Sequence, residues 1–172
     1  KDVEEAKEKL SKSMIDRLQL NEERINGIIQ SIETVVSLPD PIGNILFTNT
    51  RPNGMKVERV SVPLGVVGII YESRPNVTVD ASILCLKSGN SVILRGGSES
   101  FNSNLQLVKS MQRACGNIGL DKNTIQFIET TDRSAVDYML SKMSDYIDVV
   151  VPRGGKGLVK KVQESAKIPV IG

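Results

Sequence analysis

The chain has 172 residues, a length that predicts one domain with at most a small appendage. Hydrophobic residues make up 40% of it, charged residues 24%, and the formal net charge is +2. This balance is typical of a globular protein with its own core, and it gives no electrostatic case for a nucleic-acid partner. No apolar run approaches the roughly 18 residues of a membrane span, and no signal peptide is visible, so a membrane is not expected as a partner.

The sequence contains no histidine, which excludes Ser-His-Asp and Cys-His catalysis and every His-ligated metal site within the chain. We therefore expect no metal. The two cysteines, Cys85 and Cys115, lie among apolar residues and form no C-x-x-C pair, so they are predicted to be small buried hydrophobes rather than reactive thiols. Free cysteines without a secretion signal fit a reducing compartment, and a cytoplasmic location is expected.

Residues 1–41 are predicted to form an N-terminal helical segment of two helices. Apolar residues recur at helical spacing in the first helix and are expected to face the core: Val3, Ala6, Leu10, Met14 and Leu18. Asn21 and the two glutamates after it favour a second helix start, because the amide can cap the helix and the acids suit its dipole. This helix is expected to end near Ser37, before Pro39.

Residues 42–62 are predicted to form a β-hairpin arm. Asn53-Gly54 is a typical hairpin turn, and alternating apolar and charged residues follow it. Such a strand has one apolar and one polar face. It either projects and pairs with another chain or domain, or it packs against its own domain, and the pattern leaves both readings open.

Residues 63–172 carry the pattern of an α/β domain. Short β-branched runs predict strands at 66–71, 91–94, 124–128, 147–151 and 168–171. Helices are predicted between them at 77–87, 100–115, 133–143 and 158–166. Strands that alternate with helices indicate a parallel sheet covered on both faces. Ligands bind such sheets outside the carboxyl ends of the strands.

Two of these strand ends carry Arg-Gly-Gly, at residues 95–97 and 153–155. The first N–H groups of a following helix lack internal partners, and glycines let a phosphate approach the backbone closely. An arginine beside each turn indicates a phosphate-bearing ligand such as a dinucleotide. A tight turn alone also explains glycine here, and neither turn matches G-x-G-x-x-G or a Walker A loop, so spacing does not identify the nucleotide.

Four longer motifs allow a more specific comparison with a known family. They are Tyr-Glu-Ser-Arg-Pro-Asn-Val-Thr at 71–78, Leu-Cys-Leu-Lys-Ser-Gly-Asn at 84–90, Ile-Leu-Arg-Gly-Gly-Ser-Glu at 93–99 and Val-Pro-Arg-Gly-Gly-Lys-Gly-Leu at 151–158. Together they resemble the γ-glutamyl phosphate reductases (glutamate-5-semialdehyde dehydrogenases) of the aldehyde dehydrogenase superfamily, over about residues 1–171. The resemblance implies a variant Rossmann fold, a doubly wound parallel sheet without the usual glycine fingerprint, here with N-terminal helices and the hairpin arm.

The resemblance also implies a function. Enzymes of this family are NADPH-dependent oxidoreductases that reduce γ-glutamyl phosphate to glutamate 5-semialdehyde, with release of phosphate, in proline biosynthesis. A cysteine thiolate attacks the acyl phosphate, and hydride from the nicotinamide reduces the resulting thioester. In the family this cysteine follows the segment that resembles 167–171, so it is expected beyond Gly172. No catalytic residue is therefore assigned in this chain, which is expected to be the cofactor-binding half and inactive alone.

Site residues follow from the same resemblance. Four residues of the first glycine turn are implied as NADP contacts, with a cation suited to the 2′-phosphate: Arg95, Gly96, Gly97 and Ser98. Three resemble the second glycine-rich turn, near the cofactor's phosphates: Gly154, Gly155 and Lys156. Three occupy the loop that faces the acyl-transfer site: Ser73, Arg74 and Asn76. Ser73 stands where the superfamily usually has an oxyanion-stabilising asparagine, so that role is not carried over to it.

Two other classes of function stay open at this stage. The chain is alternatively a noncatalytic nucleotide-binding module from a split or decayed gene. It is also readable as an assembly module that uses the hairpin at 42–62 to complement another polypeptide. Because part of an α/β enzyme exposes an apolar patch, a homo-oligomer is expected.

Overall fold

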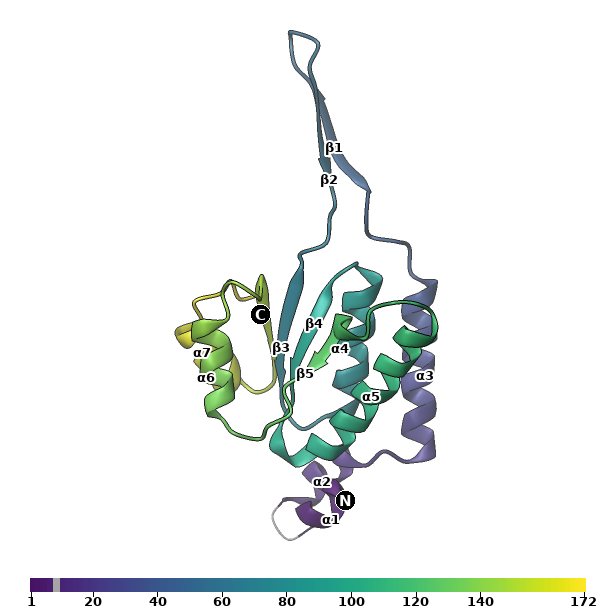
Figure 1. Cartoon of the computed structure of the whole chain (residues 1–172), viewed down its shortest axis with the longest axis vertical. Coiled ribbons are helices and arrows are strands. Elements are labelled where there is room, and N and C mark those ends of the chain that lie inside the picture. Colours follow the sequence, from purple (N-terminus) through teal and green to yellow (C-terminus); the bar gives the residue numbers. More distant parts are fainter. Residues whose placement is uncertain (8–9) are drawn as a thin grey trace.

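The computed structural model describes residues 1–7 and 10–172 as an α/β fold with two separate sheets. The main sheet has four parallel strands in the order β5-β4-β3-β6 (Figure 1). Its strands are β3 Val66–Tyr71, β4 Ser91–Arg95, β5 Ile125–Phe127 and β6 Val149–Arg153. The predicted parallel α/β sheet is therefore confirmed.

The central strand β3 sends alternate side chains to two different cores. Val67, Ile69 and Tyr71 are buried on one face with residues of the helices that cover it, while Ile70 joins the core on the opposite face. This period of two on a strand that is buried on both sides explains the nearly continuous apolar run in its sequence. Gly68 lets Met139 of the facing helix pack close to the backbone of β3, because a Cβ at Gly68 would lie 2.5 Å from Met139 Cε.

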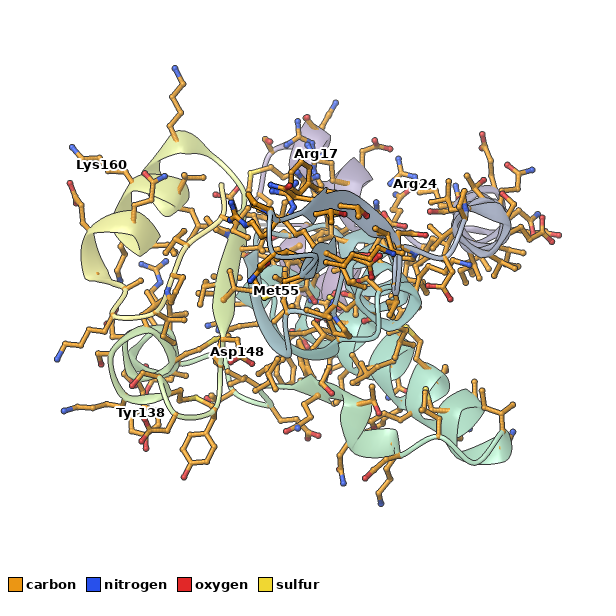
Figure 2. The ribbon with its side chains drawn as sticks, turned by 90° about the horizontal axis from the view of Figure 1, so that it is seen from above. Arg17, Arg24, Met55, Tyr138, Asp148 and Lys160 are labelled. Carbon is orange, nitrogen blue, oxygen red and sulfur yellow. The ribbon has the colours of Figure 1, made fainter. Side chains whose placement is uncertain are left out.

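Helices cover both faces of the sheet, as expected of a doubly wound fold. Helices α4 Pro75–Lys87 and α5 Phe101–Asn117 lie on one face, and α6 Ser134–Lys142 and α7 Lys156–Ser165 lie on the other. Helix α3 Glu22–Ser37 packs outside α4. Seen from the hairpin end, Tyr138 and Lys160 mark the α6–α7 layer, and Arg24 marks α3 on the far side of the sheet (Figure 2).

The N-terminal segment differs from the prediction of two helices. The first predicted helix is two short ones, α1 Asp2–Ala6 and α2 Lys12–Leu18, and the stretch between them includes residues 8–9, which lie outside the described residues. Ser11 is extended and accepts a hydrogen bond from Met14 N, so it starts a new helix. Leu18 is buried as expected, but Met14 is 40% exposed and does not belong to the core.

The hairpin of β1 Ile45–Thr50 and β2 Lys56–Val60 projects from one end of the molecule (Figure 1). Both strands are exposed along nearly their whole length, so the reading in which the hairpin packs against its own domain is wrong. The turn contains Gly54 at φ 85°, a conformation that glycine adopts without strain. The sequence therefore specifies the turn correctly, and the structure identifies the segment as an arm.

Two further boundaries differ from expectation. The predicted strand at 168–171 is reduced to one isolated bridge between Val150 and Val170, because Pro169 has no N–H to extend the ladder. The strand predicted at 124–128 is shortened by a 3-10 turn, η2 Lys122–Thr124, which precedes β5. A second 3-10 turn, η1 Ser98–Ser100, precedes α5. Within the described residues, no helix combines the length and apolar character needed to cross a membrane.

Candidate nucleotide site

The order of the strands defines where a ligand would bind. The chain builds β3, β4 and β5 outward in one direction and then returns to place β6 on the other side of β3. Such a reversal leaves a crevice at the carboxyl ends of the strands. Tyr71 is paired with Arg153, so the segments that follow β3 and β6 leave the sheet side by side. This edge faces α1 and α2, whereas the hairpin projects from the opposite edge (Figure 1).

A pocket of about 590 Å³ lies at this crevice. It combines three arginines, two glutamates and the backbone of the second glycine turn with residues of α2 and α4. Its lining comprises Met14, Arg17, Glu72, Ser73, Arg74, Val77, Glu99, Arg153, Gly154 and Gly155. Its volume falls within the range of small-molecule sites, which is roughly 300–1,000 Å³.

The second glycine turn presents an uncapped helix start. Gly155 is the N-cap of α7 and makes no side-chain cap, and the N–H groups of Leu158 and Val159 both donate to its carbonyl, at 3.0 and 3.2 Å. Among the described residues, no group accepts from the N–H groups of Lys156 and Gly157. A Cβ at Gly155 would only touch Glu72, and one at Gly157 would meet open space. This terminus therefore fits a phosphate group.

The first glycine turn is built differently, although its sequence is nearly the same. A Cβ at Gly96 would overlap the side chain of Asn104, and one at Gly97 would lie 2.7 Å from Ser73 Oγ. These glycines allow close packing of the turn against its neighbours. The helix that follows is also already capped, because the Asp2 carboxylate accepts from Ser103 N at 2.7 Å. The two Arg-Gly-Gly turns therefore have different surroundings, one packed and one open.

Arg95 and Arg153 also differ. Arg153 is exposed in the pocket, whereas Arg95 is buried, with its guanidinium bonded to the carbonyls of Gly96, Thr131 and Asp132. Burial lowers the pKa of Arg95, and the nearby Glu99 carboxylate opposes that effect. Its Nε is buried without a hydrogen-bond partner. Arg95 thus holds the 131–132 loop, and its contact with a nucleotide stays a prediction.

The loop between β3 and α4 brings the three remaining predicted residues to the pocket region. Ser73 Oγ donates to Glu99, so its proton is directed away from any oxyanion. Burial raises the pKa of Glu99, but hydrogen bonds from Ser73, its own backbone and Ser98 outweigh burial and lower the pKa overall, which keeps the group ionised. Arg74 is exposed in the pocket, and Asn76 donates to Asp80 at 3.1 Å instead of entering it.

Sequence reasoning missed several lining residues. Arg17 and Met14 come from α2, which packs beneath the sheet edge through contacts that no local pattern reveals. Glu72 and Glu99 are the sequence neighbours of Ser73 and Ser98, but no role in the site was predicted for either glutamate. Arg153 was predicted only as the arginine of the second turn, and its place at the end of a strand is the signal that puts it in the pocket.

Neither cysteine lies in the pocket. Cys85 and Cys115 are both free and buried, as predicted, in the core between the sheet and α4–α5. Burial raises the pKa of the Cys85 thiol to about 11, so this group is protonated at neutral pH. Because a thiol reacts as its thiolate, burial makes Cys85 a poor nucleophile.

Comparison with known proteins assigns the fold to a family. The sequence model of the aldehyde dehydrogenase family matches residues 2–171. γ-Glutamyl phosphate reductase of Persephonella marina is 55% identical over 172 residues, which are 99% of this chain and 38% of that protein.

Two solved structures of γ-glutamyl phosphate reductase share the fold. The Thermotoga maritima protein gives a TM-score of 0.94 at 46% identity over 98% of this chain and 41% of its own. The Saccharomyces cerevisiae protein gives 0.89 at 35% identity over 99% of this chain and 44% of its own. The chain spans about two fifths of the length of these relatives. It belongs to the aldehyde dehydrogenase family.

Proposed function

We propose that this chain is the NADP-binding part of a γ-glutamyl phosphate reductase. That enzyme would reduce γ-glutamyl phosphate to glutamate 5-semialdehyde with release of phosphate, in the cytoplasm, as a step of proline biosynthesis. Membership of the aldehyde dehydrogenase family implies a nicotinamide cofactor. The observation that carries the proposal is identity of 55% to a protein of that name along nearly the whole chain, together with a pocket at the strand-order reversal.

The two glycine turns of the chain bind different parts of the cofactor. At the second turn, the free N–H groups at the start of α7 and the Lys156 ammonium receive the diphosphate, beside Gly154 and Gly155. At the first turn, beside Gly96 and Gly97, the exposed Ser98 hydroxyl donates to the 2′-phosphate and Arg95 adds a positive charge, so NADP binds in preference to NAD. When bound, the nicotinamide supplies the hydride for reduction.

The described residues form the crevice, but they do not supply a cysteine nucleophile to it. Cys85 and Cys115 are buried away from the pocket, so neither attacks an acyl phosphate there. We therefore propose that this chain alone binds NADPH without turnover. Arg17, Arg74 and Arg153 give the crevice positive charge that suits a phosphorylated substrate.

A titration with NADPH tests the cofactor proposal. At a concentration 100 times its dissociation constant, NADPH should stabilise the folded chain by about 2.7 kcal/mol, measured by chemical unfolding. Lys156→Gln should weaken binding by about tenfold, because a charge-assisted contact to a phosphate is lost. Lys122→Gln is the matched control, since η2 precedes β5 at the opposite edge of the sheet. Unchanged stability at saturating NADPH would reject the proposal.

A second candidate function rests on the hairpin arm. Large apolar side chains on it are more than half exposed: Ile45, Leu46, Phe47 and Met55. Exposed apolar strands with unpaired edges are sites of association. We infer that the arm mediates assembly of a homo-oligomer, in addition to the cofactor-binding role.

A further inference from the structure

A second pocket, of about 540 Å³, lies beside the first between α2, α3 and the start of α4. Its wall includes Arg17, Glu23, Arg24, Ser31, Asn76 and Asp80. Arg17 and Arg74 line both pockets, so the two cavities meet at this pair of guanidinium groups. Neither glycine turn contributes to the second pocket, so it is separate from the place proposed for the cofactor's diphosphate.

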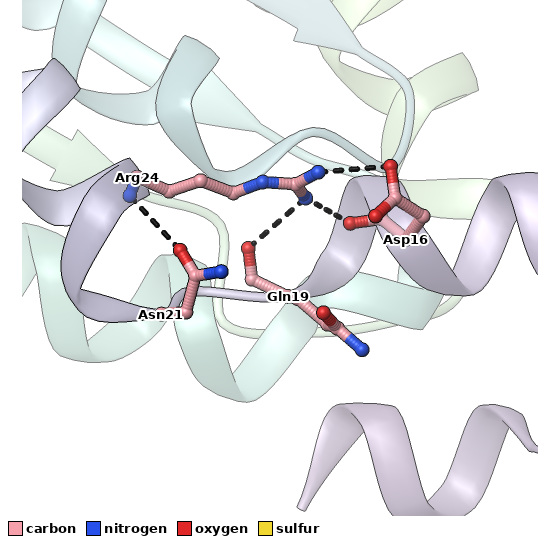
Figure 3. A network of polar contacts seen from close by, with 4 residues as sticks. All are labelled: Asp16, Gln19, Asn21 and Arg24. Carbon is pink, nitrogen blue, oxygen red and sulfur yellow. Dashed lines mark hydrogen bonds and ion pairs between the residues drawn. The ribbon is translucent and has the colours of Figure 1, made fainter.

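The arginines of this pocket are not equivalent. Arg24 is engaged, because its guanidinium pairs with Asp16 Oδ2 at 2.8 Å and donates to the Gln19 carbonyl at 3.3 Å and to that of Asp16 (Figure 3). It joins the end of α2 to the start of α3. Arg17 and Arg74, by contrast, have no ion-pair or hydrogen-bond partner for their side chains anywhere in residues 1–7 and 10–172. They are free to bind an anion.

The far side of the pocket has the opposite charge. Asp80 is half-buried, and its two oxygens accept from Ser31 Oγ at 2.9 Å and from Asn76 Nδ2 at 3.1 Å. Both donors are neutral, and no cation lies within ion-pair distance of this carboxylate in the described parts of the chain. Glu23 adds a second carboxylate to the wall. A carboxylate fixed by neutral donors retains acceptor capacity for an ammonium group.

We propose that this second pocket holds the amino-acid end of the substrate, with the α-ammonium at Asp80 and the acyl phosphate at Arg17 and Arg74. The assignment rests on the proposed function. Hydride transfer requires the acyl carbon to lie against the nicotinamide, and that carbon is one bridging oxygen away from phosphorus. The phosphate therefore lies where the substrate and cofactor pockets meet, which is where Arg17 and Arg74 lie. The amino-acid end then extends into the pocket that contains Asp80.

Three stable compounds separate the two ends of this site by calorimetric titration. L-2-Amino-6-phosphonohexanoate keeps the spacing between amino acid and phosphorus found in γ-glutamyl phosphate. Pentylphosphonate lacks the amino acid, and L-norleucine lacks the phosphonate. On the unsubstituted chain, the amino-acid phosphonate should bind at least about tenfold more tightly than either partial compound, because each charged end adds a charge-assisted contact. Equal binding of the amino-acid phosphonate and pentylphosphonate would overturn the proposal without any variant.

Variants locate the two contacts. Arg17→Gln and Arg74→Gln should each weaken both phosphonates by about tenfold and leave norleucine unaffected. Asp80→Asn should weaken the amino-acid phosphonate and norleucine but leave pentylphosphonate unchanged. Arg59→Gln, on the hairpin, is the control for loss of an exposed arginine. Thermal melting verifies that each variant is folded. Unaltered phosphonate binding in both arginine variants would overturn the phosphate assignment.

An NADPH titration on the same samples keeps the two proposals apart. Binding of NADPH without binding of any of the three compounds would overturn this inference and leave the cofactor proposal in place. Binding of the amino-acid phosphonate with the expected variant pattern, but no binding of NADPH, would reject the cofactor proposal and support the amino-acid pocket.

Discussion

The carboxylate of Asp2 accepts a hydrogen bond from the backbone N–H of Ser103 at 2.7 Å, and thereby ties the start of the chain to the first turn of α5. The same carboxylate accepts from Asn102 N at 3.2 Å and from Asn102 Nδ2 at 2.6 Å. Asp2 is 6% exposed. This contact holds α1 beneath the carboxyl edge of the sheet. It also fills the helix N-terminus that sequence alone assigned to a phosphate.

Stability should depend on pH through Asp2. Burial raises the pKa of this carboxyl, but the hydrogen bonds from Ser103 and Asn102 outweigh burial and lower it below its ordinary value of 3.8. The contribution of the ionised Asp2 carboxylate to the free energy of unfolding is therefore complete above the unfolded-state pKa. It is lost as pH falls through the folded-state pKa. Asp2→Asn should cost about 1 kcal/mol of unfolding free energy at pH 7, because a neutral amide replaces the negative charge that the helix dipole and the hydrogen-bond donors of α5 stabilise.

Urea unfolding at pH 7 and pH 3 checks this prediction. The deficit of Asp2→Asn relative to the unsubstituted chain should shrink at the lower pH. Asp145→Asn is the matched control, because Asp145 is exposed and has no hydrogen bond or ion pair in the described residues. An equal deficit at both pH values would show that Asp2 acts through packing and not through its charge.

Sequence predicted those parts of the fold that depend on local pattern. The four paired strands of the main sheet and the helices α3 to α7 follow from apolar periodicity and from caps such as Asn21, which accepts from Arg24 N at 2.9 Å. The first helix was predicted as continuous because its apolar spacing is regular. Ser11 interrupts it through a side-chain cap that competes with the helix.

The site was less predictable, because identical tripeptides have different tertiary surroundings. Nothing local distinguishes Arg95 from Arg153, yet the 131–132 loop receives the first guanidinium and the pocket receives the second. Arg17 reaches the pocket only because the N-terminal helices lie under the sheet edge. Long-range packing of this kind leaves no periodic signal in the chain.

The glycines of the two turns should respond differently to alanine. Gly96→Ala should destabilise the fold by about 2 kcal/mol, because the new methyl group overlaps the buried Asn104 and Tyr71 side chains. Gly157→Ala should stabilise it by about 0.5 kcal/mol, since nothing lies within 4 Å and the residue is in a helix. Chemical unfolding measures both. Similar effects at the two positions would contradict the distinction between a packed turn and an open one.

The Cys85 thiol should resist alkylation in the folded protein. Its pKa is raised to about 11 by burial, and the side chain is closed off from solvent between β3 and α4–α5. At pH 8, iodoacetamide should modify Cys85 at least about a hundredfold more slowly than in the urea-unfolded chain, as read by peptide mass spectrometry. Modification at comparable rates in both states would reopen Cys85 as a candidate nucleophile.

The hairpin arm should drive self-association through its apolar strand faces. Phe47 is 55% exposed, and its neighbours Ile45 and Leu46 are each 58% exposed. Phe47→Lys adds a charge to this surface without removing a strand hydrogen bond, so it should shift the chain towards monomer in sedimentation velocity experiments. Tyr138→Lys is the control, because Tyr138 is 62% exposed on α6, away from the arm. A concentration-independent monomer for the unsubstituted chain would remove the assembly role. Equal dissociation by both variants would place the contact elsewhere.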